Sequence, residues 1–466
     1  MSQTSAELIG SWFASRGWKP HAFQQDVWEA QRANEQGLII APTGSGKTYA
    51  AMASTMARAA LEGTSGKKQT GVRMIWIAPI RALTKEIKLS AERLCEGFNL
   101  DWEVGTRTGD TLASEKARQR KQLPHVLITT PESLHVLLAM KGSGKRFLDL
   151  ECLIVDEWHE LLGTKRGVQV ELAASWLRLQ RPSLMVWGIS ATLGNPQEAM
   201  AALLGPDRAG KLICAQWKKN IAVHSLMPSH LERLPWAGHL GLKLVDQVID
   251  VIRNHGSTLI FTNTRSQSEI WYHKLLESAP DLAGTLALHH SSIAKDLRDW
   301  VETALHEGEL QAVVCTSSLD LGVDFRPVEA VVQIGGPKGV ARFKQRAGRS
   351  GHSPHATSKV YFLPTHGLEL IEAAALRDSI ENERIEQREP LIRSFDVLIQ
   401  FLCTLAVGDG FVALETEKVV RSTHAFATLE KDEFVWCMQF VCSGGESLAA
   451  YEEYKRVTVD DESGRY

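Results

Sequence analysis

The chain carries a glycine-rich segment, Ala41-Pro-Thr-Gly-Ser-Gly-Lys-Thr48, between an apolar run and a helical stretch. A polyphosphate binds well to a turn whose successive backbone N–H groups converge on its anionic oxygens, and glycines permit such a turn. A lysine here reaches the β- and γ-phosphates, and the following hydroxyl coordinates Mg²⁺. The predicted contacts are Thr43, Gly44, Ser45, Gly46, Lys47 and Thr48. Nucleotide binding is the prediction, and a merely structural glycine turn is the alternative.

A second element that could act on a nucleotide is the acidic pair Asp156 and Glu157, which directly follows the apolar run Leu153-Ile-Val155. In this position Asp156 would hold Mg²⁺ through its water shell, and Glu157 would act as general base on the attacking water. His159 follows two residues later, and we predict that it couples this site to other parts of the chain. The alternative for His159 is an ordinary hydrogen-bonded polar residue, and Trp158 is interpreted as a packing residue.

These residues require strands to position them, and short β-branched runs recur along the chain. The predicted strands are Leu38–Ala41, Met74–Ala78, Val126–Thr129, Cys152–Val155, Met185–Ile189, Thr258–Thr262, Leu286–His289, Ala312–Cys315 and Ala330–Ile334. The predicted helices between them include Tyr49–Leu61, Ala82–Leu94, Val168–Leu179, Ser266–Leu276 and Ser292–His306. Strands that alternate with helices and are apolar throughout indicate parallel α/β sheets. Ligands of such sheets bind at the carboxyl ends of the strands, where the chemistry-bearing residues lie.

The strands fall into two groups, separated by a stretch near 205–241 that contains several prolines and glycines. Two doubly wound domains are therefore expected, over residues 1–205 and 206–376. Beyond these the strand–helix alternation stops, and residues 377–466 are expected to form a smaller, mostly helical third piece. A length of 466 residues is consistent with about three domains.

Composition limits the remaining possibilities. With 44% hydrophobic and 23% charged residues, the chain is expected to be soluble and globular, not disordered or a disulfide scaffold. The 52 basic and 55 acidic residues nearly balance, so nucleic-acid binding must depend on local sites. The seven cysteines include no Cys-x-x-Cys pair, and we expect reduced, mostly buried thiols without zinc or iron–sulfur. Because no membrane-length apolar run or secretory signal is visible, we expect a cytoplasmic protein without a membrane partner. Trp12, Trp18 and Trp28 are expected in the core.

Several further motifs occur in a fixed order along the chain. They are Phe23-Gln24 with Trp28, Ala78-Pro-Ile-Arg81-Ala-Leu83, Thr129-Thr-Pro131-Glu132-Ser-Leu, Ser190-Ala-Thr192, Ile260-Phe-Thr-Asn263-Thr264-Arg265, Thr316-Ser-Ser-Leu-Asp-Leu-Gly322-Val-Asp324 and Gln345-Arg346-Ala-Gly348-Arg349-Ser-Gly-His352. Together with the glycine-rich loop and the Asp-Glu pair, this series over about 330 residues resembles the superfamily 2 helicases of the DExH type. The resemblance implies two tandem RecA-like domains that bind Mg²⁺ and ATP.

More specifically, the chain resembles the Lhr branch of these helicases, particularly the bacterial ligase-associated DExH helicases. The similarity includes Asp156–Leu161, the Gly-His ending of the last motif, Ser394–Gln400 and Gly445–Tyr451. It implies a winged helix after the two RecA-like domains, then further C-terminal domains. Because the sequence stops soon after the winged-helix region, a partial winged helix and a C-terminally truncated chain are expected.

The resemblance also assigns residues to ligands. It places Gln24 at the adenine edge and Gly322 and Asp324 among the nucleotide contacts. On one strand of nucleic acid it places Arg81, Thr130, Pro131, Glu132, Asn263, Thr264, Arg265 and Thr316. Backbone contacts of this kind carry little sequence information, so binding is expected to be tolerant of sequence and sensitive to salt. The alternative for each hydroxyl residue is helix capping.

The arginine that stabilises the transition state is less directly assigned. Many relatives end the last motif in a second arginine, whereas this chain has His352, which is largely uncharged at pH 7 at its usual pKa. A permanent cation must then come from Arg349 or Arg346, and Arg349 is favoured. ATP binding would close the two domains around the nucleotide, and loss of the γ-phosphate would release them.

The resulting expectation is an ATP-dependent helicase or translocase. The resemblance further implies DNA as the track, 3′-to-5′ movement, and a role in DNA repair beside an ATP-dependent DNA ligase and a nuclease. Two alternatives remain open: an ATP-driven remodeller or RNA helicase that does not separate DNA strands, and a nucleotide-gated binding module with negligible turnover.

Overall fold

The computed structural model describes residues 4–63, 71–81, 83–216, 220–227, 241–320, 328–351, 357–445, 451, 453 and 455–466. They divide into two compact units. The first unit contains the described residues of 1–41, 46–215 and 387–466, and the second contains those of 42–45 and 216–386. Each unit is built around its own parallel sheet.

The sheet of the first unit has the strand order β3-β4-β2-β5-β6-β1-β7, and all its pairs are parallel. The strands are β1 (Gly37–Ile40), β2 (Met74–Ile77), β3 (Val104–Arg107), β4 (Val126–Thr129), β5 (Cys152–Val155), β6 (Met185–Ser190) and β7 (Lys211–Cys214). The four central strands β4, β2, β5 and β6 are buried at every position, which is why their sequences are continuously apolar.

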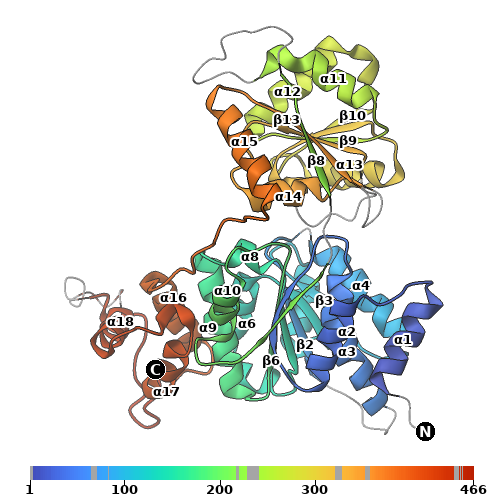
Figure 1. Cartoon of the computed structure of the whole chain (residues 1–466). Coiled ribbons are helices and arrows are strands. Elements are labelled where there is room, and N and C mark those ends of the chain that lie inside the picture. Colours follow the sequence, from blue (N-terminus) through green and yellow to red (C-terminus); the bar gives the residue numbers. More distant parts are fainter. Residues whose placement is uncertain are drawn as a thin grey trace. The chain divides into compact units, whose positions relative to one another are not determined.

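Helices cover both faces of this sheet. They are α1 (Ser5–Ser15), α2 (Ala22–Arg32), α3 (Lys47–Gly63), α4 (Leu83–Gly97), α5 (Ala113–Lys121), α6 (Pro131–Leu138), α7 (Ser143–Arg146), α8 (Trp158–Leu161), α9 (Lys165–Gln180) and α10 (Pro196–Leu204). Helices α2 and α3 lie on one face, and α9 and α10 lie on the other (Figure 1). This is the arrangement that places strand ends, loops and helix starts together at the carboxyl edge of the sheet.

The second unit repeats the design with the strand order β10-β11-β9-β12-β13-β8, again parallel throughout. Its strands are β8 (Ile221–Ser225), β9 (Thr258–Phe261), β10 (Leu286–His289), β11 (Ala312–Cys315), β12 (Ala330–Ile334) and β13 (Ser358–Leu363). Its helices are α11 (Val245–Arg253), α12 (Arg265–Ser278), α13 (Lys295–Glu307), α14 (Val340–Ala347) and α15 (Leu368–Glu381), with short 3₁₀ turns at Leu242–Leu244, Pro280–Leu282 and Ser317–Leu319. Two apolar clusters fill the two faces of the sheet.

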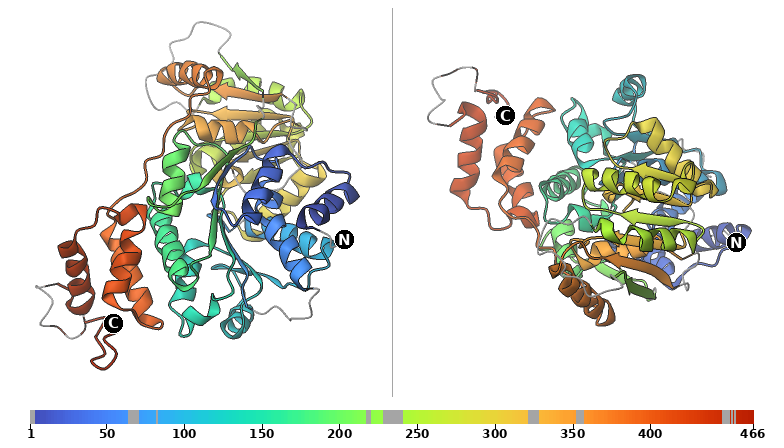
Figure 2. Two further views of the ribbon diagram at one scale, coloured as in Figure 1. Left: turned by 60° about the horizontal axis from the view of Figure 1, so that its bottom comes forward. Right: turned by 90° about the horizontal axis from the view of Figure 1, so that it is seen from above.

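The C-terminal region adds α16 (Phe395–Val407), α17 (Ala413–Arg421), the 3₁₀ turn His424–Phe426 and α18 (Lys431–Ser443). Helices α16 and α17 pack against α9 (Figures 1 and 2). Phe401 and Phe426 are fully buried and belong to the same apolar cluster as Leu153 and Val186 of the first sheet. The C-terminal helices and the first sheet therefore share one continuous core.

Polar bonds reinforce this packing. The Asp409 carboxylate accepts hydrogen bonds from the backbone N–H groups of Gly142 at 2.6 Å and Gly144 at 3.2 Å. The buried Glu171 of α9 accepts the backbone N–H of Ala425 at 2.8 Å. Burial raises the pKa of Glu171 to about 8, so this carboxyl is held largely protonated at neutral pH. The C-terminal region is thus fixed to the first unit by both apolar and polar contacts.

The predicted fold class is confirmed: two parallel α/β sheets are followed by a mostly helical region. All nine predicted strands occur. The first sheet extends beyond the predicted limit at residue 205, because β7 pairs with β1, and β7 and β8 lie within the predicted linker. Helix α15 continues past residue 376, and Leu376 packs in the core of the second unit. The predicted domain boundaries at residues 205 and 376 stay predictions.

One core prediction was wrong. Trp12 and Trp28 are buried, but Trp18 is 43% exposed. It lies just after the end of α1, where its ring packs against Trp12 and Tyr49 with centroids 5.8 and 5.7 Å apart. Because these contacts leave much of the indole in solvent, Trp18 borders an aromatic cluster and does not fill the core.

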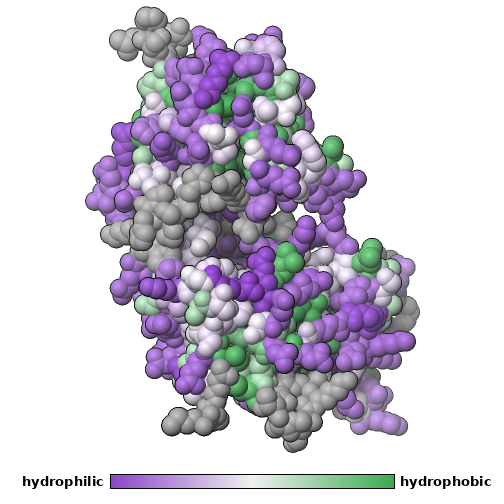
Figure 3. All heavy atoms as spheres, turned by 90° about the vertical axis from the view of Figure 1, so that its right-hand side faces the viewer, coloured by the Kyte–Doolittle hydropathy of each residue, from purple (hydrophilic) through white to green (hydrophobic). Residues whose placement is uncertain are grey.

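Hydrophilic side chains predominate on the face shown in Figure 3, and apolar ones occur there in small groups. Of the helices in the described part of the chain, none combines the length and the apolarity that crossing a membrane requires. Cys95, Cys152, Cys315 and Cys437 are buried, as expected for most of the thiols, whereas Cys214 is exposed.

Candidate active site

The predicted nucleotide-binding residues follow strands of the first sheet. The glycine-rich loop follows β1, Asp156 and Glu157 follow β5, and Ser190 ends β6. Because the strands are parallel, their carboxyl ends meet at one edge of the sheet. Register supports this directly, since Ile40 of β1 pairs with Ser190 of β6.

The glycine-rich loop leads into α3, which begins at Lys47. Gly44 and Gly46 have positive φ angles of 76° and 77°, a region that glycine enters without strain. The Nζ atom of Lys47 is buried, and it has no hydrogen-bond partner among the described residues. A buried ammonium group without a partner is costly, so this atom fits a phosphate oxygen well. Thr48 lies beside it in the first turn of α3, and Thr43 and Ser45 lie in the loop.

Gln24 contacts this loop from α2. Its Nε2 donates to the backbone oxygen of Gly46 at 3.1 Å, and its Oε1 accepts the backbone N–H of His21 at 2.9 Å. A Cβ atom on Gly46 would lie 2.6 Å from the Gln24 Nε2, so a larger residue there would displace the end of the Gln24 side chain. In the structure Gln24 braces the phosphate loop, while its predicted contact with adenine stays a prediction.

The two carboxylates after β5 differ in environment. Asp156 is buried, and burial together with the neighbouring Glu157 carboxylate raises its pKa, against the opposing effect of Lys47. Glu157 adopts a left-handed conformation, with φ 44° and ψ 47°. Such a conformation costs a non-glycine residue about 1–3 kcal/mol and is typical of functional sites. The Glu157 Oε2 atom is buried and accepts no hydrogen bond from the described residues, so it can receive one from a water molecule.

His159 links the acidic pair to the next strand. Its Nδ1 lies 3.0 Å from the Ser190 hydroxyl and 3.5 Å from Glu157 Oε2. Burial lowers the pKa of His159, so the ring is neutral at pH 7. Trp158 is fully buried and donates to the backbone oxygen of Ala199 at 2.8 Å, which confirms its packing role. The predicted coupling role of His159 is consistent with this position between the acidic pair and Ser190.

The predicted nucleic-acid contacts of the first unit lie on the loops after β2 and β4. Thr130 caps α6 by accepting the Ser133 backbone N–H at 3.4 Å, as the capping alternative requires, and Pro131 is the first residue of that helix. The exposed Arg81 pairs with Asp110 at 2.7 Å. Glu132 forms a two-pronged ion pair with Arg166, at 2.5 and 3.2 Å. The nucleic-acid contacts themselves stay a prediction.

Arg166 is a residue that sequence reasoning missed. Besides holding Glu132, its Nη1 donates to the backbone oxygen of Pro79 at 2.7 Å. One guanidinium in the first turn of α9 thereby joins the loop after β2 to the start of α6. The partners lie 34 and 87 residues away in the sequence, so no local pattern indicated the connection.

In the second unit, the predicted nucleic-acid residues follow β9 and β11. Asn263 Nδ2 donates to the Gly336 backbone oxygen at 2.9 Å. Thr264 caps α12 by accepting the Gln267 backbone N–H at 3.1 Å, and Arg265 Nη1 donates to the Ser292 hydroxyl at 2.5 Å. Thr316 is buried directly after β11. Gly322, Asp324 and His352 lie outside the described residues.

The two candidate arginines of the second unit differ sharply. Arg346 is 2% exposed, and its Nε and Nη2 bind the two Asp320 oxygens at 2.7 and 3.1 Å. Its Nη1 binds Gln333 at 2.7 Å, and Phe261 lies under the guanidinium at 4.7 Å. Arg349 is only half-buried, and its Nη2 donates to the Asp320 backbone oxygen at 2.9 Å. All three nitrogens of the Arg346 guanidinium therefore already have partners inside the second unit, and Arg349 stays the predicted catalytic cation.

Comparison with known proteins agrees with this architecture. Residues 21–200 match the DEAD/DEAH box helicase family, and residues 242–353 match the helicase conserved C-terminal domain. Residues 378–466 match the winged helix domain of the large helicase-related protein, Lhr. The chain belongs to the Lhr family of superfamily 2 helicases. The mostly helical C-terminal region of this Lhr-family chain is accordingly its winged-helix domain.

Curated relatives cover most of the chain. It is 32% identical over 93% of its length to the ATP-dependent helicase Lhr-Core protein 2 of Thermococcus barophilus, and covers 52% of that protein. It is 30% identical over 95% of its length to the ATP-dependent helicase Lhr-Core of Methanothermobacter thermautotrophicus, and covers 54% of that protein. The chain thus spans about half the length of these two relatives.

A solved structure extends the comparison. The helicase Lhr of Mycobacterium smegmatis, bound to ssDNA and AMP-PNP, superimposes with a TM-score of 0.85 and 28% identity. The match covers 98% of this Lhr-family chain and 60% of that chain. Similarity of both sequence and fold therefore extends from the sheets through the winged helix.

Proposed function

We propose that this chain is an ATP-dependent DNA helicase or translocase. The observation that carries the proposal is the pair of unsatisfied buried atoms at the edge of the first sheet: Lys47 Nζ and Glu157 Oε2. One suits a phosphate oxygen and the other suits the water that attacks it, which are the two ends of a hydrolysis reaction. The M. smegmatis relative binds AMP-PNP and ssDNA, which supports both ligand assignments.

The chain's own residues perform separable tasks in this proposal. Lys47 and the backbone of the glycine-rich loop bind the β- and γ-phosphates, and Glu157 accepts a proton from the attacking water. The left-handed backbone of Glu157 is a strained conformation of the kind that is typical of functional sites. Arg349 stabilises the charge that develops on the γ-phosphate, an effect worth roughly 10³–10⁵ in rate in comparable enzymes.

Mg²⁺ fits the residues at this edge. The Thr48 hydroxyl and the Asp156 carboxylate would hold it, and carboxylate and hydroxyl oxygens are ligands that this ion prefers. When bound, it neutralises phosphate charge. The raised pKa of Asp156 reflects a carboxylate buried next to Glu157, and a nearby cation would favour the ionised form of Asp156.

For the nucleic acid, we propose single-stranded DNA held by backbone contacts. In the first unit the contacts come from the loops after β2 and β4, which Arg166 joins. In the second unit they come from the residues after β9 and β11. The 3′-to-5′ direction, a role in DNA repair, and partnership with an ATP-dependent DNA ligase and a nuclease are proposed from the resemblance to ligase-associated helicases.

The test compares ATP hydrolysis and strand separation on one preparation. Single-stranded DNA and RNA of matched sequence are added at several salt concentrations, and duplexes with a 3′ or a 5′ tail serve as unwinding substrates. The proposal expects stimulation by DNA that weakens with salt, and unwinding of the 3′-tailed duplex alone. Stimulation without unwinding would instead support a remodeller. DNA binding without stimulated turnover would support a nucleotide-gated module.

A further inference from the structure

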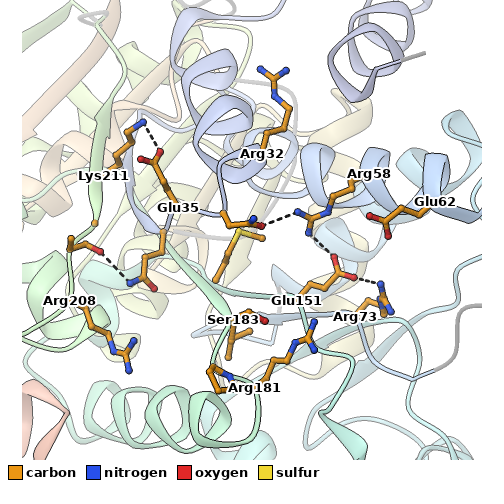
Figure 4. A pocket seen from close by; sticks show the side chains of 17 residues that line it. Arg32, Glu35, Arg58, Glu62, Arg73, Glu151, Arg181, Ser183, Arg208 and Lys211 are labelled. Carbon is orange, nitrogen blue, oxygen red and sulfur yellow. Dashed lines mark hydrogen bonds and ion pairs between the residues drawn. The ribbon is translucent and has the colours of Figure 1, made fainter. Parts of the chain in front are cut away.

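A large pocket lies at the opposite edge of the first sheet from the nucleotide site. Its volume is about 910 Å³, and several of its lining residues directly precede strands (Figure 4). Gln36 precedes β1, Arg73 precedes β2, and Glu151 precedes β5. Because the strands are parallel, this is the amino edge, and no step of the proposed hydrolysis uses it.

The lining of this pocket is strongly basic. Its cations are Arg32, Arg58, Arg73, Arg181, Arg208 and Lys211, and its carboxylates are Glu35, Glu62 and Glu151. Arg32 and Arg181 lie at the carboxyl ends of α2 and α9, where a helix carries about half a negative charge. Two such helix ends offset only about one of the three excess positive charges. The pocket is therefore basic in a chain whose formal net charge is −3.

Ion pairs within the pocket leave part of this charge unmatched. Glu151 binds Arg58 at 2.7 Å and also Arg73, and Glu35 binds Lys211 at 2.6 Å. In Figure 4, Arg58 and Arg73 reach the Glu151 carboxylate from two sides, and Arg181 lies on the same side of the pocket. The Glu151 carboxylate thus binds two guanidinium groups.

Buried atoms show where a further acceptor is needed. The Nε atoms of Arg73 and Arg181 are both buried, and neither has a hydrogen-bond partner in the described chain. A guanidinium N–H that is removed from water without an acceptor is unfavourable. Phosphate oxygens bind guanidinium groups in a two-pronged manner and supply several acceptors at once.

We propose that this amino-edge pocket binds a free polyphosphate anion of nucleotide size, at a site distinct from the glycine-rich loop. The volume lies within the range of small-molecule pockets, about 300–1,000 Å³. The basic residues surround a hollow, whereas a nucleic-acid strand requires a basic track that continues along the surface. A free anion therefore fits the distribution of charge better than a polynucleotide does.

The pocket also lies at the far ends of the elements that build the nucleotide site. Arg58 belongs to α3, which begins at Lys47, and Glu151 precedes β5, which ends at Asp156. An anion that binds Arg58, Arg73 and Arg181 at once would connect helix α3 to the loops that precede β2 and β6. The site therefore has the position of a regulatory site for the ATPase.

The experiment measures binding of inorganic tripolyphosphate by calorimetry without Mg²⁺. All proteins in this experiment are the full chain with Lys47→Ala, so that binding at the glycine-rich loop does not contribute to the measured heat. We expect about one equivalent to bind. Adding Arg181→Gln is expected to weaken binding at least tenfold, because a charge-assisted contact is lost. Adding Arg208→Gln, on the exposed rim, provides a second variant with little risk to folding and is expected to weaken binding several-fold.

The matched control is Arg93→Gln, an exposed arginine of α4 that does not line the pocket. Its tripolyphosphate affinity is expected to equal that of the Lys47→Ala parent. The proposal is overturned if the parent binds no tripolyphosphate, or if Arg93→Gln weakens binding as much as Arg181→Gln. Displacement of tripolyphosphate by a 12-nucleotide oligo(dT) would also overturn it, since the pocket would then belong to a nucleic-acid surface. None of these outcomes depends on whether the chain unwinds DNA.

Discussion

The carboxyl edges of the two sheets use polar residues differently. At the first edge, Lys47 Nζ and Glu157 Oε2 are buried without a hydrogen-bond partner among the described residues. At the second, the three guanidinium nitrogens of Arg346 all bind Asp320 or Gln333. Unsatisfied buried atoms are costly and persist where a ligand completes them, whereas satisfied ones hold the fold. We therefore expect residues whose buried polar atoms lack a hydrogen-bond partner to affect turnover, and residues whose buried polar atoms are fully hydrogen-bonded to affect stability.

The largest effects are expected for two single variants at the carboxyl edge of the first sheet, Glu157→Gln and Lys47→Ala. Each variant is expected to reduce DNA-stimulated ATP hydrolysis by about 10³-fold or more, because a proton acceptor or a phosphate contact is lost. The midpoint of thermal unfolding is expected to stay within a few degrees of the parent value. Near-normal turnover by the glutamine variant would show that Glu157 is not the base.

The second edge is tested by Arg346→Ala and Arg349→Ala as a pair. Arg346→Ala removes the two short hydrogen bonds to the buried Asp320 carboxylate and leaves it with only the longer ion pair to Arg342, at 3.5 Å, so it is expected to cost about 3 kcal/mol of unfolding free energy. Arg349→Ala is expected to reduce turnover by roughly 10³-fold, with ATP affinity and stability nearly unchanged. Denaturant unfolding and steady-state kinetics on both variants check this. The reverse pattern would exchange the two assignments.

Glu171, a buried carboxyl away from both edges, provides a reference for the comparison. Its pKa is about 8 in the folded chain and 4.5 as the ordinary value, so the folded state binds more protons between these limits. The free energy of unfolding of the first unit is therefore expected to fall as pH rises from about 4.5 to about 8, by on the order of a few kcal/mol.

Glu171→Gln keeps an acceptor for the Ala425 N–H and removes this titration. The difference in unfolding free energy between parent and variant, measured from pH 5 to pH 8, isolates the Glu171 contribution. His424 is present in both proteins, and its pKa is lowered by burial, so its own contribution has the opposite sign and cancels in the difference. A difference that does not change with pH would contradict the assignment.

The smallest expected effect concerns Arg166, which positions the loops after β2 and β4. Arg166→Ala is expected to raise the DNA concentration for half-maximal ATPase stimulation about tenfold, and to leave kcat at saturating DNA within twofold. Lys165→Ala is the matched control, because the neighbouring Lys165 pairs instead with Asp396 of the winged helix, at 2.5 Å. A loss of kcat without a change in DNA dependence would place Arg166 with the catalytic residues.

Central strands were predictable from the sequence, and most edge strands were not. The nine predicted runs are apolar because neighbours cover both faces. The missed strands β3, β7 and β8 lie at sheet edges. β3 contains Gly105 and Arg107, and most residues of β7 and β8 are only partly buried or exposed, so their sequences lack the continuous apolar signal. The fourth, β13, alternates between exposed and buried residues in part of its length.

The chemistry of the site was also predictable in part. Lys47, Asp156 and Glu157 could be predicted because each belongs to a short motif directly after a strand. The sequence favoured Arg349 over Arg346 as the catalytic cation, but it gave no sign that Asp320 and Gln333 hold Arg346, because these contacts form only on folding. The role of Gln24 in bracing Gly46, and that of Arg166 in joining two loops, depend on contacts between residues 22 or more positions apart.

The core shared by the winged helix and the first sheet has a practical consequence. Phe401, Leu402 and Phe426 are fully buried in that core. A version of the chain shortened to end at Glu386 would expose the surface of α6 and α9 that these side chains cover. Such a shortened version is expected to self-associate on purification. Studies of the two sheets should therefore use a chain that retains residues 387–466.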